Sequence, residues 1–171
     1  KVSHIQESQF ATLGQNITAL EVDGVFDDCQ AMIKQAFMDE TLNHHMKLTS
    51  ANSINVARFL PQAFYYFYAY AQLKLVISVP SGNFGNLCAG LFAYKMGLPV
   101  NRFIAANNAN DVFFHYLRTG EYMPQPSKQT LANAMDVGNP SNFARIYTLF
   151  NGSHQAITEL ISGATYTDDM I

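Results

Sequence analysis

Residues 80–86, Pro-Ser-Gly-Asn-Phe-Gly-Asn, form the stretch of this 171-residue chain that is best suited to chemistry. They follow a short apolar run at 75–79, whose β-branched residues predict a buried parallel strand. They precede an Ala-, Leu- and Gly-rich segment that predicts a helix to about Met96, with Gly97 as its stop. Two glycines can adopt backbone conformations closed to other residues and let the main chain approach a ligand. The first amides of a helix face that ligand with the positive end of the helix dipole. A strand, a glycine loop and a helix start together predict an anion cradle, most often for a phosphate.

Spacing excludes two nucleotide-binding cradles. A P-loop requires a lysine directly after its second glycine, and no lysine follows the loop before Lys95. A dinucleotide site requires a third glycine and an acidic residue after the next strand. The loop has only Gly82 and Gly85, and the next predicted strand, 102–105, runs into Ala-Asn-Asn at 106–108. The remaining alternative to an anion cradle is a plain turn of small residues without a ligand.

The elements around the loop predict a parallel α/β fold. Three strand–loop–helix units in succession, starting at Ile17, Leu75 and Arg102, imply one parallel sheet, and ligands bind such sheets beyond the carboxyl ends of the strands. The other predicted elements are a strand at 17–22, an amphipathic helix at 26–38, a helix from 59 to 73, a helix at 112–118 ended by Gly120, a long crossing at 121–142, and helices at 143–150 and 157–161.

The helix at 59–73 carries aromatic residues nearly all round, which predicts a buried helix. Pro61 should either kink it or lie in the first turn of a second helical piece. Only Lys74 separates this helix from the strand that starts at Leu75. Such a short connection suggests that a segment is missing near 73–75, and a weaker signal of the same kind lies near 151–153.

The loop resembles the Ser-Gly-Asn-x-Gly-Asn loop that holds the phosphate of pyridoxal phosphate (PLP) in fold-type II enzymes, and residues 78–86 resemble threonine synthases in particular. Further segments are similar to that family in the same order, namely 11–17, 23–30, 48–55, 97–100, 102–107, 110–111, 131–137 and 139–143. The resemblance covers roughly residues 5 to 150, so it is far more specific than a single glycine loop.

The resemblance implies a fold, a cofactor and an activity. The fold would be a fold-type II (tryptophan synthase β-like) parallel sheet with helices on both faces, here incomplete. The activity would be the conversion of O-phospho-L-homoserine and water to L-threonine and phosphate, with PLP as electron sink. The cofactor-binding residues that the resemblance implies are Ser81, Gly82, Asn83, Phe84, Gly85 and Asn86.

A second group of candidates lies upstream of the loop. Residues 49–53 offer more hydroxyl and amide side chains than one helix start needs, in a segment that resembles the family. We therefore expect Ser53, Asn55 and Arg58 on the substrate side of the site. The planar fork of Arg58 suits an oxyanion, although a helix-surface arginine or an internal ion pair is an equal alternative.

Part of the family's machinery has no counterpart in this chain. The Schiff-base lysine of the family lies in an upstream Lys-Asp segment, and none of the six lysines has that context. We therefore expect residues 1–171 to be the central part of the PLP-binding region of a longer enzyme, and to be inactive alone. The alternatives are another fold-type II lyase, such as a serine or threonine dehydratase, or a catalytically inactive relative or association module.

Composition excludes several partners. The net charge is −3 and no basic cluster exists, which argues against nucleic acid, and no apolar run is long enough to span a bilayer. The neighbours His44 and His45 lack a cysteine or carboxylate at ligand spacing, so no metal site is predicted. Two distant cysteines fit a reducing cytoplasm. We expect a cytoplasmic monomer or homodimer that acts on a small molecule.

Overall fold

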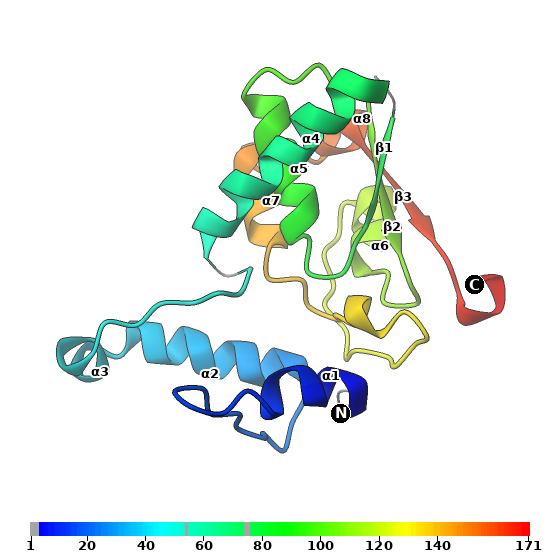
Figure 1. The fold of residues 1–171 in the computed structure, drawn as a ribbon. Helices are drawn as coiled ribbons and strands as arrows, with labels where there is room; N and C mark the ends of the chain where they lie inside the picture. Colours follow the sequence, from blue (N-terminus) through cyan, green and yellow to red (C-terminus); the bar gives the residue numbers. More distant parts are fainter. Residues whose placement is uncertain (1–3, 54, 74–75) are drawn as a thin grey trace. The chain divides into compact units, whose positions relative to one another are not determined.

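The structure, a computed structural model, describes residues 4–53, 55–73 and 76–171, and it divides into two compact units, residues 1–48 and 49–171. The described part of the smaller unit holds the helices α1 (His4–Ala11), α2 (Phe26–Met38) and α3 (Glu40–His45) (Figure 1). The predicted helix at 26–38 is confirmed. The predicted strand at 17–22 is wrong, because these residues form irregular chain in which Leu20 is 84% exposed. Alternating residues form a strand only where a neighbouring strand pairs with their backbone groups.

The larger unit is built on a three-stranded parallel sheet of order β1-β2-β3. Its elements, in chain order, are η1 (Val56–Arg58), α4 (Phe59–Leu73), β1 (Ile77–Pro80), α5 (Gly85–Lys95), β2 (Phe103–Asn107), α6 (Val112–Thr119), η2 (Asn133–Met135), α7 (Phe143–Leu149), α8 (His154–Leu160), β3 (Ile161–Thr165) and η3 (Asp168–Met170). The predicted parallel α/β architecture is confirmed. Its third strand is β3, however, which the sequence analysis assigned in part to a helix.

The predicted helix boundaries hold well in this unit. Helix α5 ends at Lys95, and Gly97 follows with a left-handed φ of 105°. Helix α6 ends at Gly120, whose φ is 80°. Helix α4 begins directly after η1, so Pro61 lies in the first turn of a second helical piece, as one of the two expectations had it. Each of these helix boundaries lies at a glycine or a proline, whose backbone preferences are strong.

Helices pack on one face of the sheet. The residues that are in register on the three strands show which side chains lie on that face. Phe103 of β2 pairs with Ile77 and Ile161, and its buried ring lies 6.0 Å from the ring of Tyr66 of α4. A β-carbon on Gly90 of α5 would lie 2.7 Å from the Tyr66 ring and 2.8 Å from the Phe103 ring. These contacts require a glycine in the middle of α5 and join α4, α5 and β2 into one core.

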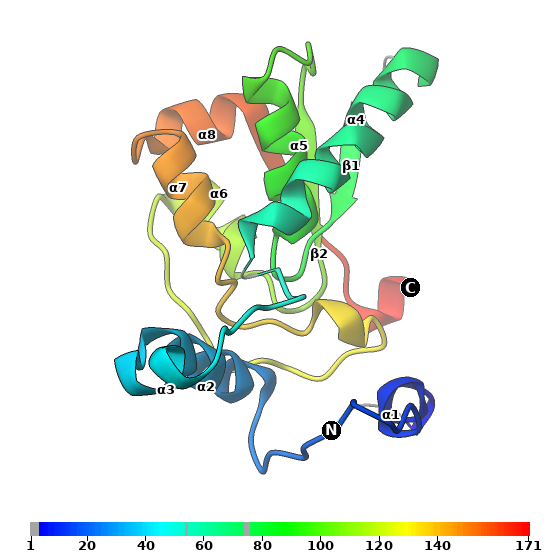
Figure 2. The same cartoon turned by 60° about the vertical axis from the view of Figure 1, so that its left-hand side comes forward.

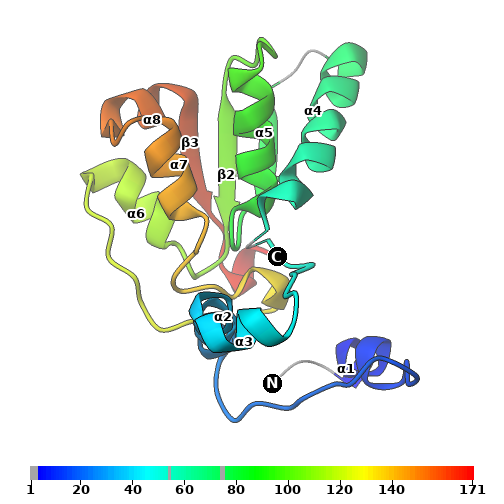
Figure 3. The same ribbon diagram turned by 90° about the vertical axis from the view of Figure 1, so that its left-hand side faces the viewer.

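Helix α6 meets the same face. Gly163 of β3 is in register with Ala105, and a β-carbon there would lie 2.7 Å from the ring of Phe114 of α6. Figure 3 shows α6 and α7 to the left of β2 and α5 to its right. On the opposite face, Ser78 and Pro80 are exposed. The contacts described for the sheet therefore place these helices on one face, whereas the sequence predicts helices on both.

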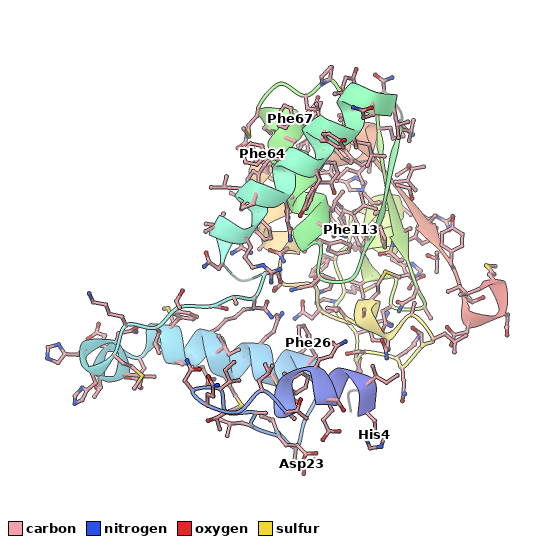
Figure 4. All side chains as sticks on the ribbon, in the orientation of Figure 1. His4, Asp23, Phe26, Phe64, Phe67 and Phe113 are labelled. Atoms are coloured by element: carbon pink, nitrogen blue, oxygen red, sulfur yellow. The ribbon has the colours of Figure 1, made fainter. Side chains whose placement is uncertain are left out.

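Helix α4 is only half covered. It lies beside α5 (Figures 1 and 2), and its inner side chains Phe59 and Ala63 are buried. Its outer side chains include Phe64 and Tyr65, which are 64% and 73% exposed. Figure 4 labels Phe64 on α4 and the buried Phe113 on α6. The expectation of a helix buried all round is therefore wrong for this chain, since aromatic content alone does not decide which face meets the core.

The two expected breaks in the chain have different outcomes. The first falls on residues 74 and 75, which lie outside the described residues. At the second, near 151–153, Asn151 and Gly152 take left-handed φ values of 53° and 74°. The Ser153 hydroxyl then accepts a hydrogen bond from Ala156 N at the start of α8. The structure thus has a tight turn there, and missing segments at both places stay predictions.

The two faces of α4 predict different costs of truncation. Phe59 is 0% exposed and Phe64 is 64% exposed on the same helix. We expect Phe59→Ala to lower the free energy of unfolding of the 171-residue chain by about 3–5 kcal/mol, because it leaves a cavity. Phe64→Ala is the matched control and should cost less than about 1 kcal/mol. Urea unfolding followed by circular dichroism measures both, and equal losses would contradict the assignment of the core.

Candidate functional site

The glycine loop connects the carboxyl end of β1 to the first turn of α5 and leaves a run of backbone amides free. Among the described residues, the amides of 82–86 donate no hydrogen bond to the protein. The amides that flank this run are engaged: those of Ser81, Leu87 and Cys88 donate to Ala106 O (2.7 Å), Asn86 Oδ1 (2.9 Å) and Phe84 O (2.9 Å). Consecutive free amides at a helix start form a binding place for an anion.

The side chains of the loop are used to hold its shape. The Ser81 hydroxyl, 1% exposed, donates to Val79 O at 2.8 Å, and Asn86 Nδ2 donates to Pro80 O at 2.7 Å. The ring of Phe84 is buried, with its centre 4.7 Å from that of Phe113. Because these side chains are occupied within the protein, the groups of the loop that remain for a ligand are its amides.

The carbonyl at the end of the loop is held by a buried tyrosine. The Tyr66 hydroxyl of α4 donates to Asn86 O at 2.7 Å. Burial raises the pKa of this phenol well above its usual range, and the Cys88 thiol nearby acts in the same direction. The hydroxyl therefore stays protonated, and remains a donor, near neutral pH.

Asn83 ties the loop to two distant segments. Its Oδ1 accepts hydrogen bonds from the amide and the hydroxyl of Ser141, at 2.7 and 3.0 Å. Its Nδ2 donates to the hydroxyl of Ser53 at 2.8 Å, and that hydroxyl donates onward to Asn52 Oδ1 at 3.0 Å. The structure thus brings Ser53, predicted on the substrate side, to the loop itself.

The two glycines serve packing rather than an unusual backbone conformation. The left-handed residue of the loop is Phe84, with φ 59° and ψ 16°, and neither Gly82 nor Gly85 has a positive φ. A β-carbon on Gly82 would lie 2.9 Å from Met135 Cα, and one on Gly85 would lie 3.2 Å from both the Phe59 ring and Ser53 Cβ. The expectation that the glycines supply conformational freedom is therefore corrected: each one admits a neighbouring segment.

Asn55 and Arg58 have local partners. Asn55 Oδ1 accepts from Ala57 N and its Nδ2 donates to Ser50 O, both at 3.0 Å. The exposed Arg58 donates from Nη1 to Ala51 O. These bonds shape the turn that carries Ser53, and no described bond joins either side chain to the loop. Their contact with a substrate stays a prediction.

Two residues that the sequence analysis did not single out complete the site. Asn142, 0% exposed, donates from Nδ2 to Asn83 O at 2.8 Å and accepts at Oδ1 from Arg145 Nη1. Arg145 also donates to Ser53 O at 3.1 Å, and its guanidinium lies 5.2 Å from the centre of the Phe59 ring. The sequence signal was weak, because an asparagine before a helix is usually a cap and Arg145 lies within α7.

A second hydrogen-bond network fixes the long segment 121–142 where it passes beside Gly82. The Asp136 carboxylate accepts hydrogen bonds from Asn108 Nδ2 (2.8 Å), from Asn110 Nδ2 (3.2 Å) and from the hydroxyl and amide of Thr130 (2.7 and 3.0 Å). Asn108 and Asn110 follow the carboxyl end of β2. The network therefore anchors the crossing to that end of the sheet, next to Met135, which contacts the loop.

The part of the chain that the structure describes was also compared with the requirements of a metal site and of a membrane-spanning helix, and it meets neither. No three His, Cys, Asp or Glu side chains among residues 4–53, 55–73 and 76–171 are grouped so that they could hold a metal ion. None of the helices described is long and apolar enough to cross a membrane.

Cys88 lies beneath the loop on α5. Its thiol is 2% exposed and donates to Asn142 O at 3.7 Å. Burial raises the pKa of this thiol from 9.0 to about 12, and the charge of Arg145 opposes that shift in part. The thiol is therefore protonated and unreactive near neutral pH.

Comparison with known proteins shows what the chain is similar to. No family model matches it. Threonine synthase of Serratia marcescens is 50% identical over 99% of this chain and 42% of its own length. The crystal structure of threonine synthase from Escherichia coli aligns with a TM-score of 0.88 at 49% identity, over 96% of this chain and 40% of that one. PLP-bound threonine synthase from Brucella melitensis gives 0.79 at 32% identity, over 99% and 43%. The chain thus spans about two fifths of the length of the curated relatives it matches.

The two cysteines should differ in reactivity. At about pH 8 we expect iodoacetamide to modify the half-buried Cys29 while Cys88 stays unmodified until the protein unfolds. Peptide mass mapping with and without urea makes the comparison, and rapid modification of folded Cys88 would contradict its burial.

The Cys88 thiol also makes the free energy of unfolding depend on pH. The unfolded thiol ionises near 9.0 and the folded one near 12, so its contribution is present below pH 9 and is lost as the pH rises to about 12.

Proposed function

This chain belongs to the threonine synthase family, of whose members it spans about 40%, and we propose that it supplies the phosphate-holding part of a PLP-dependent threonine synthase. The observation that carries the proposal is the run of free amides at 82–86, at the start of a helix of eleven residues. Amide donors and the positive end of a helix dipole suit the phosphate of PLP, and the polar side chains of the loop are bonded within the protein.

Each group of the loop has a distinct task in this proposal. The amides of Gly82, Asn83, Phe84, Gly85 and Asn86 bind the phosphate. Bound PLP supplies an electron sink for carbanions formed on the substrate. The side chains of Ser81, Asn83 and Asn86 hold the loop in place, so its amides are oriented before the phosphate arrives and little reorganisation accompanies binding.

The substrate and reaction follow from the family. The whole enzyme converts O-phospho-L-homoserine and water to L-threonine and phosphate, as a carbon–oxygen lyase that acts on phosphates, in the cytoplasm and as a monomer or homodimer. Ser53 is supported on the substrate side by its hydrogen bond to Asn83. Asn55 and Arg58 are assigned to that side with Ser53, because they stand on the same turn. The relatives reported above all carry the name threonine synthase, which favours this reaction over that of a serine or threonine dehydratase.

The full-length protein provides the test. We expect purified enzyme to release phosphate and form L-threonine from O-phospho-L-homoserine, and to lose both when PLP is removed. Amino-acid analysis and a phosphate assay measure the two products together. Formation of 2-oxo acids from L-serine or L-threonine, without phosphate release, would instead indicate a dehydratase and overturn the proposal.

The 171-residue chain alone should not retain PLP covalently. None of its six lysines has the family's sequence context, and Lys95 of α5 lies over the ring of Phe150, 4.8 Å from the ring centre. We expect borohydride treatment after incubation with PLP, followed by dialysis and peptide mapping, to show no single labelled lysine. Stoichiometric labelling of one lysine that O-phospho-L-homoserine prevents would place the catalytic lysine within this chain.

A further inference from the structure

We propose that Asn142, held by Arg145, is a positioning residue that keeps the peptide between Asn83 and Phe84 turned so that its N–H faces the bound phosphate. The inference rests on the proposed function of the loop. Asn142 Nδ2 donates to Asn83 O at 2.8 Å. In a trans peptide the carbonyl and the N–H point in opposite directions. The bond that holds the carbonyl of Asn83 on one side therefore fixes the N–H of Phe84 on the other.

An amide side chain has the donor and the acceptor that this bridge requires. The Arg145 guanidinium has donors alone, and the Asn83 carbonyl is an acceptor alone. The residue between them must accept at one end and donate at the other, as Asn142 does with Oδ1 and Nδ2. The chemistry of the two neighbours thus orients the amide, and the complete burial of Asn142 keeps water from replacing either partner.

The backbone of the loop requires such a support. Phe84 has φ 59° and ψ 16°, a left-handed conformation that bulky residues rarely adopt. A rotation of the 83–84 peptide by half a turn would return φ of Phe84 to a negative value without moving its buried ring. The bond from Asn142 opposes that rotation, so it holds the conformation in which the loop amides are free.

A rotated peptide would harm phosphate binding in particular. It would replace the N–H of Phe84 with the carbonyl oxygen of Asn83 on the side of the anion. The phosphate would lose one donor and meet the negative end of a dipole instead. In this proposal the phosphate is the part of PLP that meets this peptide, so binding of the ring should be unaffected.

This difference defines the experiment. PLP and pyridoxal, which lacks the phosphate, are titrated into the full-length apoprotein by calorimetry. Asn142→Asp keeps the size of the side chain and the acceptor for Arg145 but removes the donor to Asn83. We expect the affinity for PLP to fall at least about tenfold while that for pyridoxal is unchanged. Asn139→Asp is the matched control, an identical change at an exposed side chain three residues earlier, and should leave both affinities unchanged.

Each other outcome has a defined meaning. If Asn142→Asp lowers both affinities equally, or neither, the positioning role is wrong. If the natural protein binds pyridoxal as tightly as PLP, the proposed function of the loop fails instead. Thermal melting shows whether the variant is folded. If it is not, Arg145→Met decides, since it frees the Asn142 amide to turn while keeping contact with Phe59. It should lower the ratio of PLP to pyridoxal affinity, and an unchanged ratio would overturn the inference.

Discussion

The hydrogen bond from the buried Asn142 amide to the carbonyl of Asn83 is the interaction on which the loop depends. A loop can offer consecutive amides to an anion only if its other polar groups are satisfied within the protein. Here the carbonyls at 83 and 86 accept from Asn142 and Tyr66, and the side chains of 81, 83 and 86 bond to the surrounding backbone and to serines. The free amides are therefore a consequence of the bonding around them.

That bonding explains the arrangement of the larger unit. The partners of the loop come from a turn near Ser53, from the start of α7 and from η2, which lie far apart in the sequence. The Asp136 network anchors the crossing that carries η2, and the stacking of Arg145 on Phe59 joins α7 to α4. The sheet and its helices thus act as a frame that brings three segments against one glycine loop.

Strong local signals made the centre of this unit predictable from sequence. The run 75–79, the loop and the stop at Gly97 each depend on a few adjacent residues, and the observed elements follow them closely. Strand β3 was missed because Ile-Ser-Gly-Ala-Thr carries little apolar alternation, and its Gly163 is needed only because α6 packs there. The roles of Phe84 and Arg145 could not be predicted, because they depend on contacts between segments separated by tens of residues.

The site relies on neutral groups where charged ones would have been possible. Asparagine side chains occupy the central positions, and the guanidinium of Arg145 is directed to Asn142 and Ser53 O, so its described bonds support the loop. Amides do not titrate, and the nearby Cys88 and Tyr66 have pKa values raised by burial. The asparagine, cysteine and tyrosine side chains beside the loop therefore keep one charge state near neutral pH, whereas a phosphate monoester changes its own near pH 6. We therefore expect the pH dependence of the proposed phosphate binding to originate in the ligand rather than in the residues that shape the loop.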